Sequence, residues 1–172
     1  MPQVWKAFEK NPITHSAVHH LIAIAQLIND RGYARITDVA SCLEITRGSV
    51  SMTLKSLEKD GLVCRDRNRF LLLTPEGEFV AQATQMKKQL FKQFLRDVLE
   101  VSEEDADIDS CKIEHLIGLD TGHRLCELMH FFNSAHPAAE DFLRAFRKFR
   151  KIRCEVEDCV DCGDHCLLSP EA

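Results

Sequence analysis

The chain has 172 residues, 45% of them hydrophobic and 28% charged, as in an ordinary soluble protein of one extended domain or two small ones. It has no apolar run long enough to cross a bilayer, and its first ten residues, MPQVWKAFEK, lack the core of a secretion signal. These features argue against a membrane protein and lead us to expect a cytoplasmic location. Eight cysteines in such a chain favour metal or redox chemistry over a disulfide framework.

The net charge of −5 is unevenly distributed along the chain. Residues 1–99 hold 14 basic and 10 acidic side chains, a balance of +4, whereas residues 100–172 hold 8 and 17, a balance of −9. We therefore expect the basic first half to carry any surface that binds a polyanion. The acidic second half is expected to collect cations or to face away from the polyanion.

The first predicted elements precede residue 32. Residues 1–13 are expected to form a short helix or arm, and residues 14–30 a helix ended by Gly32. Apolar side chains recur along the second helix at the spacing of one buried face. Its first half also carries three histidines, His15, His19 and His20.

Residues 36–73 have the order of a winged helix-turn-helix. A short helix over 37–43 and a turn precede a longer helix over 46–60, capped by Thr46 or Ser49 and ended by Gly61. Two strands, 62–65 and 70–73, then flank a polar tip rich in arginine. The leading helix face and the tip are suited to base edges and phosphates of double-stranded DNA. The residues expected to contact DNA are Arg47, Ser49, Ser51, Met52, Lys55, Arg65, Arg67 and Arg69.

The rest of the chain is predicted to be helical, so the fold class is mainly α. Thr74-Pro75-Glu76 opens a helix to about residue 99, and Ser102 opens another. A break at Gly118 and Asp120-Thr121 precedes a helix through Phe132, and His136-Pro137 opens the last, to about residue 152. Large apolar side chains in this half indicate either a monomer core or a helical dimer interface.

The segment Cys111-Lys112-Ile113-Glu114-His115 is a candidate metal site. Helical spacing brings Cys111 within one turn of Glu114 and His115, so that three kinds of ligand share one face. A fourth ligand must then come from elsewhere in the chain. A buried thiol and a core histidine are the alternative for this segment.

Four stretches carry a family resemblance: GYARITDVASCLEI, SVSMTLKSLEKDGLV, FLLLTPEGE and CKIEHLIG. In content, order and spacing they resemble the diphtheria-toxin-repressor and manganese-transport-regulator family of metal-dependent transcriptional repressors. The resemblance spans roughly residues 14–132. It implies a winged helix-turn-helix over 1–75 and an all-helical metal-binding and dimerisation domain over 76–153, without the SH3-like third domain of longer members.

The resemblance also implies a ligand set. Counted back from Gly32, His19 falls at the family's first-helix ligand, which makes the site His19, Cys111, Glu114 and His115; His20 is the alternative to His19. A cysteine and two histidines favour Fe²⁺, then Zn²⁺, over Mn²⁺. Lys88 and Lys92 stand at the positions of the family's second site, so we expect no second ion, and a lysine charge in its place is a hypothesis.

Residues 154–172 form a cysteine-rich acidic tail outside the resemblance. Four thiols within thirteen residues predict an iron–sulfur cluster, with zinc as the alternative and His165 as a possible substitute ligand. The four are Cys154, Cys159, Cys162 and Cys166. By contrast, His123, Cys126 and His130, on one helix, are expected to be packing or surface residues.

Together these patterns predict a homodimeric, metal-responsive regulator, most simply a repressor of iron or other metal-homeostasis genes, that binds a palindromic operator. The alternative is an iron–sulfur redox-sensing regulator or electron-transfer protein in which the tail is the working centre. We find no nucleophile–base pair, P-loop or dinucleotide fingerprint, and so expect neither an enzyme nor a small organic substrate.

Overall fold

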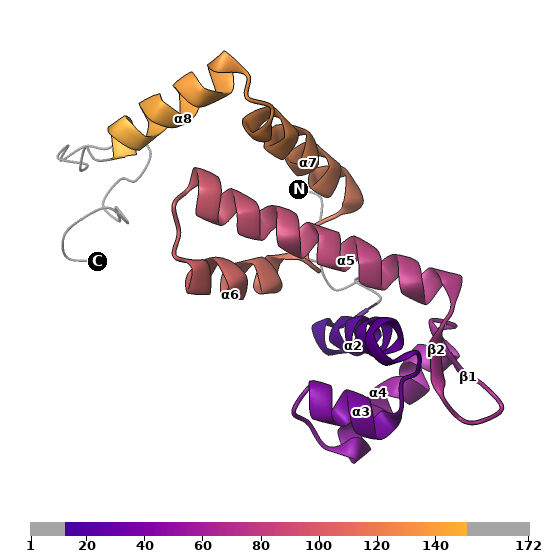
Figure 1. Ribbon diagram of the computed structural model, residues 1–172. Coiled ribbons are helices and arrows are strands. Elements are labelled where there is room, and N and C mark those ends of the chain that lie inside the picture. Colours follow the sequence, from indigo (N-terminus) through magenta and orange to yellow (C-terminus); the bar gives the residue numbers. More distant parts are fainter. Residues whose placement is uncertain (1–12, 151–172) are drawn as a thin grey trace, which may run out of the picture. The chain divides into compact units, whose positions relative to one another are not determined.

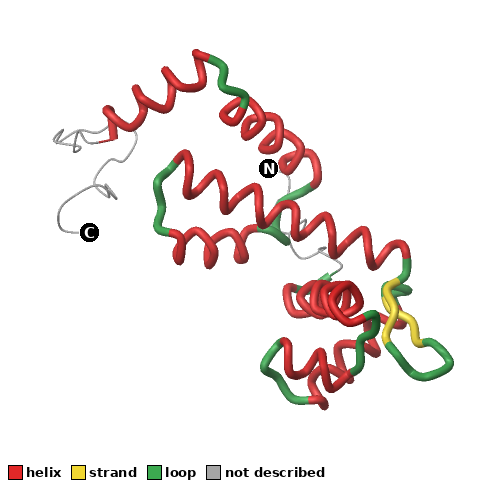
Figure 2. Tube along the Cα trace, viewed as in Figure 1, coloured by secondary structure: helices red, strands yellow, loops and turns green. Residues whose placement is uncertain are grey.

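A computed structural model describes residues 13–150 of the chain (Figure 1). Within that range it contains seven α-helices, one π-helical turn and one two-stranded hairpin. Figure 2 colours the helices red and the strands yellow. The predicted mainly α class is confirmed. None of the described helices is both long and apolar enough to span a bilayer. Contacts among the described residues divide them into two compact units, with the boundary between Cys126 and Glu127.

The first helices begin and end where local signals place them. Helix α2 (His15–Arg31) is capped by Thr14, whose side chain accepts a hydrogen bond from the backbone N–H of Ala17, and it ends at Gly32 with a φ of +78°. Helix α3 (Ile36–Cys42) follows, and helix α4 (Arg47–Lys59) is capped by Thr46. Of the two candidate caps, Thr46 therefore serves, and its hydroxyl accepts from the backbone N–H of Ser49 at 3.1 Å.

The wing is a short antiparallel hairpin of β1 (Val63–Arg65) and β2 (Leu71–Leu73). Its turn is organised by Asp66, whose Oδ1 accepts hydrogen bonds from the backbone N–H groups of Asn68 and Phe70 at 2.9 and 2.7 Å. A bridge from Ala34 to Leu71 ties the hairpin to the loop between α2 and α3. Helix, turn, helix and wing thus appear in the predicted order.

The apolar core lies among α2, α3, α4 and the wing. Its fully enclosed side chains include Leu21, Ile24, Val39, Val50, Leu54 and Leu71, each 0% exposed. One Leu side chain buried in this way contributes roughly 1.5–3 kcal/mol relative to an exposed one. The winged part of the molecule therefore has a core of its own, which α5 extends through Ala81.

Two helices carry the chain onward from the wing. Helix α5 (Pro75–Gln93) continues into the π-helical turn η1 (Phe94–Val98), so the predicted helix to about residue 99 is present with a widened last turn. Gly77 permits α5 to start against the wing, because a Cβ at this position would lie 2.0 Å from the carbonyl oxygen of Leu62. Helix α6 (Glu103–Ile113), capped by Ser102, then packs along α5 (Figure 1).

The last helices are α7 (Leu119–Asn133), which crosses from the first unit into the second, and α8 (Pro137–Arg150). The interruption predicted between the two helices ends before Leu119, so Asp120 belongs to the first turn of α7. In the second unit the ring of Phe142 lies 5.5 Å from that of Phe132 and 6.1 Å from that of Phe146, between centroids. Phe142 and Phe149 remain 51% and 69% exposed, so α8 keeps an apolar surface.

Candidate metal centre and nucleic-acid interface

Two histidines one turn apart on α2 form the first half of the candidate metal centre. His15 and His19 are spaced i, i+4, which places them on one side of the helix. Their Nε2 atoms lie 3.0 Å apart. Two ring nitrogens that close to each other, with an acidic neighbour, can both bind one cation.

The end of α6 supplies the other half. Cys111 Sγ lies 3.4 Å from His19 Nε2 and 3.5 Å from His15 Nε2, and Glu114 Oε1 lies 3.7 Å from His19 Nε2. One donor atom from each of these four residues falls within 4.8 Å of the other three, and this is the only such group among residues 13–150. Residues almost a hundred positions apart therefore converge on one point. We call these four residues the α2–α6 centre.

Of the four residues of the α2–α6 centre, Glu114 has the surroundings that most favour a bound cation. It is 0% exposed, and neither carboxylate oxygen accepts a hydrogen bond from the described residues. Burial raises its pKa to about 7, against the opposing charges of Lys88 and Lys87. An ionised carboxylate enclosed without hydrogen bonds is costly unless a cation neutralises it. Glu114 therefore fits a metal ligand better than it fits any structural role in the metal-free chain.

The pKa values of two other donors, His19 and Cys111, are also shifted by their surroundings. Burial, then the neighbouring His15 and Lys88, lowers the pKa of His19, so its ring is neutral and has a free lone pair near neutral pH. Burial, followed by the charge of Glu114, raises the pKa of the Cys111 thiol. The thiol must lose its proton when it binds an ion, so binding at this centre releases protons.

The structure brings together three of the four expected ligands, His19, Cys111 and Glu114, and adds His15. The ring of the fourth, His115, lies beside His15 with 4.7 Å between centroids, outside the group of converging atoms. Helix α6 ends at Ile113 with Glu114 as its C-cap, and His115 lies in the turn that follows. The signal for His15 was available in the sequence, because His-x3-His on a helix is a common pair of ligands.

His20, the alternative to His19, has a different role. It is 1% exposed, and its Nδ1 lies 2.6 Å from the carbonyl oxygen of Ser16 on the same helix. This is a core histidine bonded to its own helix. His123 and His130 are exposed and Cys126 is half-buried, and they join no ligand group in the described chain. The four tail cysteines, Cys154, Cys159, Cys162 and Cys166, and His165 lie outside the described residues.

The expected DNA-reading surface is formed by α4 and the wing. Arg47, Ser49, Met52 and Lys55 are exposed, and Met52 is 74% exposed although it is apolar, whereas Ser51 is only half-exposed. The three arginines of the wing differ in their contacts. Arg65 Nε donates to Glu58 Oε1 at 2.6 Å, while Arg67 and Arg69 stand exposed at the tip.

The chain is similar to known metal-dependent regulators. Residues 74–143 match the model of the iron dependent repressor, metal binding and dimerisation domain. The HTH-type transcriptional regulator MntR of Bacillus pumilus is 32% identical over 122 residues, 71% of this chain and 84% of that protein. MntR of Geobacillus kaustophilus is 34% identical over 119 residues, 69% of this chain and 84% of that protein.

A solved structure supports the fold. The manganese regulator SloR superposes with a TM-score of 0.61 at 22% identity. The match covers 67% of this chain and 54% of SloR, so the chain spans about half of that longer protein.

Proposed function

The chain belongs to the diphtheria-toxin-repressor and manganese-transport-regulator family, and from this premise we propose that it is a metal-dependent, DNA-binding transcriptional repressor. The α2–α6 centre is its sensor site, with His15, His19, Cys111 and Glu114 as ligands and His115 beside them. The observation that carries the proposal is Glu114, a fully enclosed carboxylate that accepts no hydrogen bond from residues 13–150 and faces three further donors.

The proposed mechanism follows from where the ligands sit. His15 and His19 belong to α2, the helix at the heart of the winged part, and Cys111 and Glu114 belong to the end of α6. Both helices pack against α5, and the ligand side chains hold them to each other when an ion is bound. Binding therefore favours one placement of the reading surface, and a differential affinity of a few kcal/mol is enough to switch DNA binding.

The donor set bears on which metal is sensed. A thiolate and two imidazoles are softer than oxygen ligands, which favours Fe²⁺ or Zn²⁺ at the α2–α6 centre. SloR, by contrast, is named a manganese regulator. We propose Fe²⁺ as the first candidate for this chain and Zn²⁺ as the second.

DNA recognition is proposed to rest on α4 and the wing of a homodimer. A two-fold dimer presents two copies of α4 to successive major grooves of a palindromic operator. The polar and basic side chains of α4 contact base edges and phosphate, and the exposed thioether of Met52 is suited to a thymine methyl group. The wing arginines hold phosphate. Exposed apolar side chains such as Phe142 and Phe149 are available to the dimer contact.

The test measures operator binding as a function of metal. An operator is first selected from random DNA with Fe²⁺-loaded protein under anaerobic conditions, and binding is then followed by fluorescence anisotropy with Fe²⁺, Zn²⁺, Mn²⁺ or chelator. We expect sequence-specific binding that a metal raises at least about tenfold, a coupling of about 1.4 kcal/mol. Glu114→Gln should lose the metal response, whereas His123→Ala, which removes an exposed histidine away from the centre, should keep it.

Metal-independent binding by the unaltered chain, or an unchanged response in Glu114→Gln, would contradict the proposal. The cysteine tail is tested separately. Acid-labile sulfide with extra iron in anaerobically purified protein would support an iron–sulfur cluster in the tail. Zinc without sulfide would support a zinc site there instead.

A further inference from the structure

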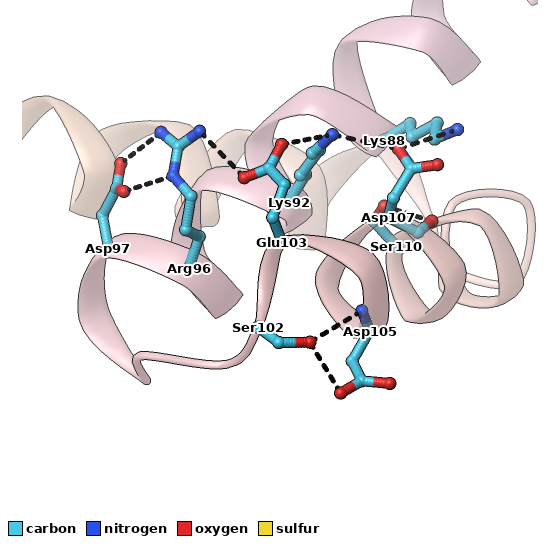
Figure 3. Close-up of polar contacts among 9 residues, drawn as sticks. All are labelled: Lys88, Lys92, Arg96, Asp97, Ser102, Glu103, Asp105, Asp107 and Ser110. Atoms are coloured by element: carbon cyan, nitrogen blue, oxygen red, sulfur yellow. Dashed lines mark hydrogen bonds and ion pairs between the residues drawn. The ribbon is translucent and has the colours of Figure 1, made fainter.

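Two rows of opposite charge line the contact between α5 and α6 (Figure 3). Lys92 Nζ lies 2.8 Å from Glu103 Oε1 and 3.2 Å from Asp107 Oδ1, and Lys88 Nζ lies 3.4 Å from the same Asp107 oxygen. Arg96 closes the far end, with Nη1 3.5 Å from Glu103 Oε2. We call these five residues, Lys88, Lys92, Arg96, Glu103 and Asp107, the charge ladder. It is partly exposed, so each pair alone stabilises the chain only weakly.

The ladder leads directly to the α2–α6 centre. Cys111 follows Asp107 by one turn of α6, and Glu114, the C-cap of that helix, follows Cys111 by three residues, so these residues continue one stripe of oxygen and sulfur donors. Lys88, on α5, pairs with Asp107 at the last step before Cys111. Its ammonium is therefore the ladder cation nearest to the ligands.

An ammonium group in this place has two consequences for ions. It carries three N–H donors and no lone pair, so Lys88 cannot itself bind a metal while it is protonated. Together with Lys92, it also occupies Asp107, the carboxylate that would otherwise extend the ligand stripe beyond Cys111. A second divalent ion next to Cys111 would meet a fixed positive charge and, in Asp107, a carboxylate that already pairs with Lys88 and Lys92.

We propose that Lys88 acts as a built-in cation beside the α2–α6 centre, so that the centre takes one divalent transition-metal ion per chain and excludes a second. The inference rests on the proposed function, because it concerns the same site. It assigns Lys88 a role in setting how many ions are sensed, in which the side chain positions charge and binds no ion itself.

The test counts Zn²⁺ ions by equilibrium dialysis and elemental analysis of the full-length chain. Ions bound elsewhere are measured in a His19→Ala, Glu114→Gln double variant and subtracted. We expect one ion at the centre in the unaltered chain and in Lys88→Arg, which keeps the charge. Lys88→His supplies a ring nitrogen and leaves Asp107 paired with Lys92 alone, and should raise the number to two. Lys88→Ala should bind the first ion at least about tenfold more tightly.

The control is Lys112→Ala, which removes an exposed ammonium of α6 that pairs with Asp109 and should leave count and affinity unchanged. Circular dichroism verifies that each variant is folded. Two ions in the unaltered chain, or one ion with unaltered affinity in both Lys88→His and Lys88→Ala, would overturn the inference alone. No ion at the centre of the unaltered chain would overturn the proposed function with it.

Discussion

Helix α2 takes part in two regions that are built on opposite principles. Leu21 and Ile24 enter the core of the winged part, where apolar side chains from α3, α4 and the wing enclose them completely. His15 and His19 instead meet Cys111 and Glu114, whose enclosed carboxylate accepts no hydrogen bond within the described part of the chain. The first region is saturated by the chain's own atoms, and the second is not.

The difference indicates which region needs a ligand. Apolar burial is non-directional and can be completed within one chain, whereas an enclosed carboxylate needs a specific donor or a cation. The winged part should therefore fold and hold its shape without metal. The link between α2 and α6 should depend on an ion, and this separation of duties is what a sensor requires.

The largest expected effect on the free energy of unfolding is in the apolar core of the winged part. Leu54→Ala removes a fully buried side chain and should lower the free energy of unfolding by roughly 2–5 kcal/mol. Because the cavity lies in the apolar core, the loss should be the same with and without metal. Urea denaturation measures it. A loss below about 1 kcal/mol, as for a site that relaxes freely, would mean that this core is less complete than described.

The next effect concerns Glu114 and depends on pH. Its pKa in the folded, metal-free chain is about 7, above its ordinary 4.5. A raised carboxyl pKa gives stability that is present below pH 4.5 and lost as the pH rises through 7. Glu114→Gln should therefore make the metal-free chain more stable than the unaltered one at pH 8, by roughly 1–3 kcal/mol, and this advantage should vanish near pH 4.5.

The comparison is made by denaturation in chelator at both pH values. Adding Zn²⁺ at pH 8 should stabilise the unaltered chain more than the variant, because only the former keeps the carboxylate ligand. A pH-independent difference between the two would show that Glu114 is not held in a costly ionised state.

A smaller effect is expected at the start of α4. Thr46→Ala removes the cap that accepts from the backbone N–H of Ser49 and should cost about 1 kcal/mol of stability. Thr46→Ser keeps the hydroxyl and should recover most of the loss. Thermal unfolding followed by circular dichroism resolves the two. Equal losses in both variants would mean that the threonine methyl, and not the cap, is what matters.

The smallest effect on stability should come from the wing. Arg67 is exposed at the tip, so Arg67→Ala should leave folding unchanged but weaken binding to all DNA sequences and reduce the salt slope of binding by about one. Arg65 is held by Glu58, and Arg65→Ala should change the slope less. If the salt slope of Arg67→Ala matched that of the unaltered chain, this side chain would not contact phosphate.

Local signals explain why the winged part was predictable. Thr14 and Thr46 cap their helices, Gly32 and Gly61 have positive φ where the helices have ended, and the hairpin follows from alternation and a polar turn. Each of these features is decided within a few residues. The bounds of α2, α3, α4 and the strands therefore agree with the prediction to within one or two residues.

The centre was less predictable, because it depends on contacts between distant segments. Spacing alone grouped Cys111, Glu114 and His115, but α6 ends at Ile113, and the turn that follows carries His115 away from the converging atoms. Only the packing of α2 and α6 on α5 brings His15 to Cys111. The ion pairs of Lys88 with Asp107 and of Lys92 with Glu103 likewise depend on the packing of α6 along α5.

Crystals of the full-length chain loaded with Zn²⁺, measured by anomalous diffraction at the zinc edge, test the central claim most directly. We predict one anomalous peak between α2 and α6, about 2.0–2.3 Å from donor atoms of His19, Cys111 and Glu114, with His15 or His115 completing the set. Well-ordered crystals with no peak there, and with Glu114 still enclosed beside an uncoordinated His19, would contradict the account.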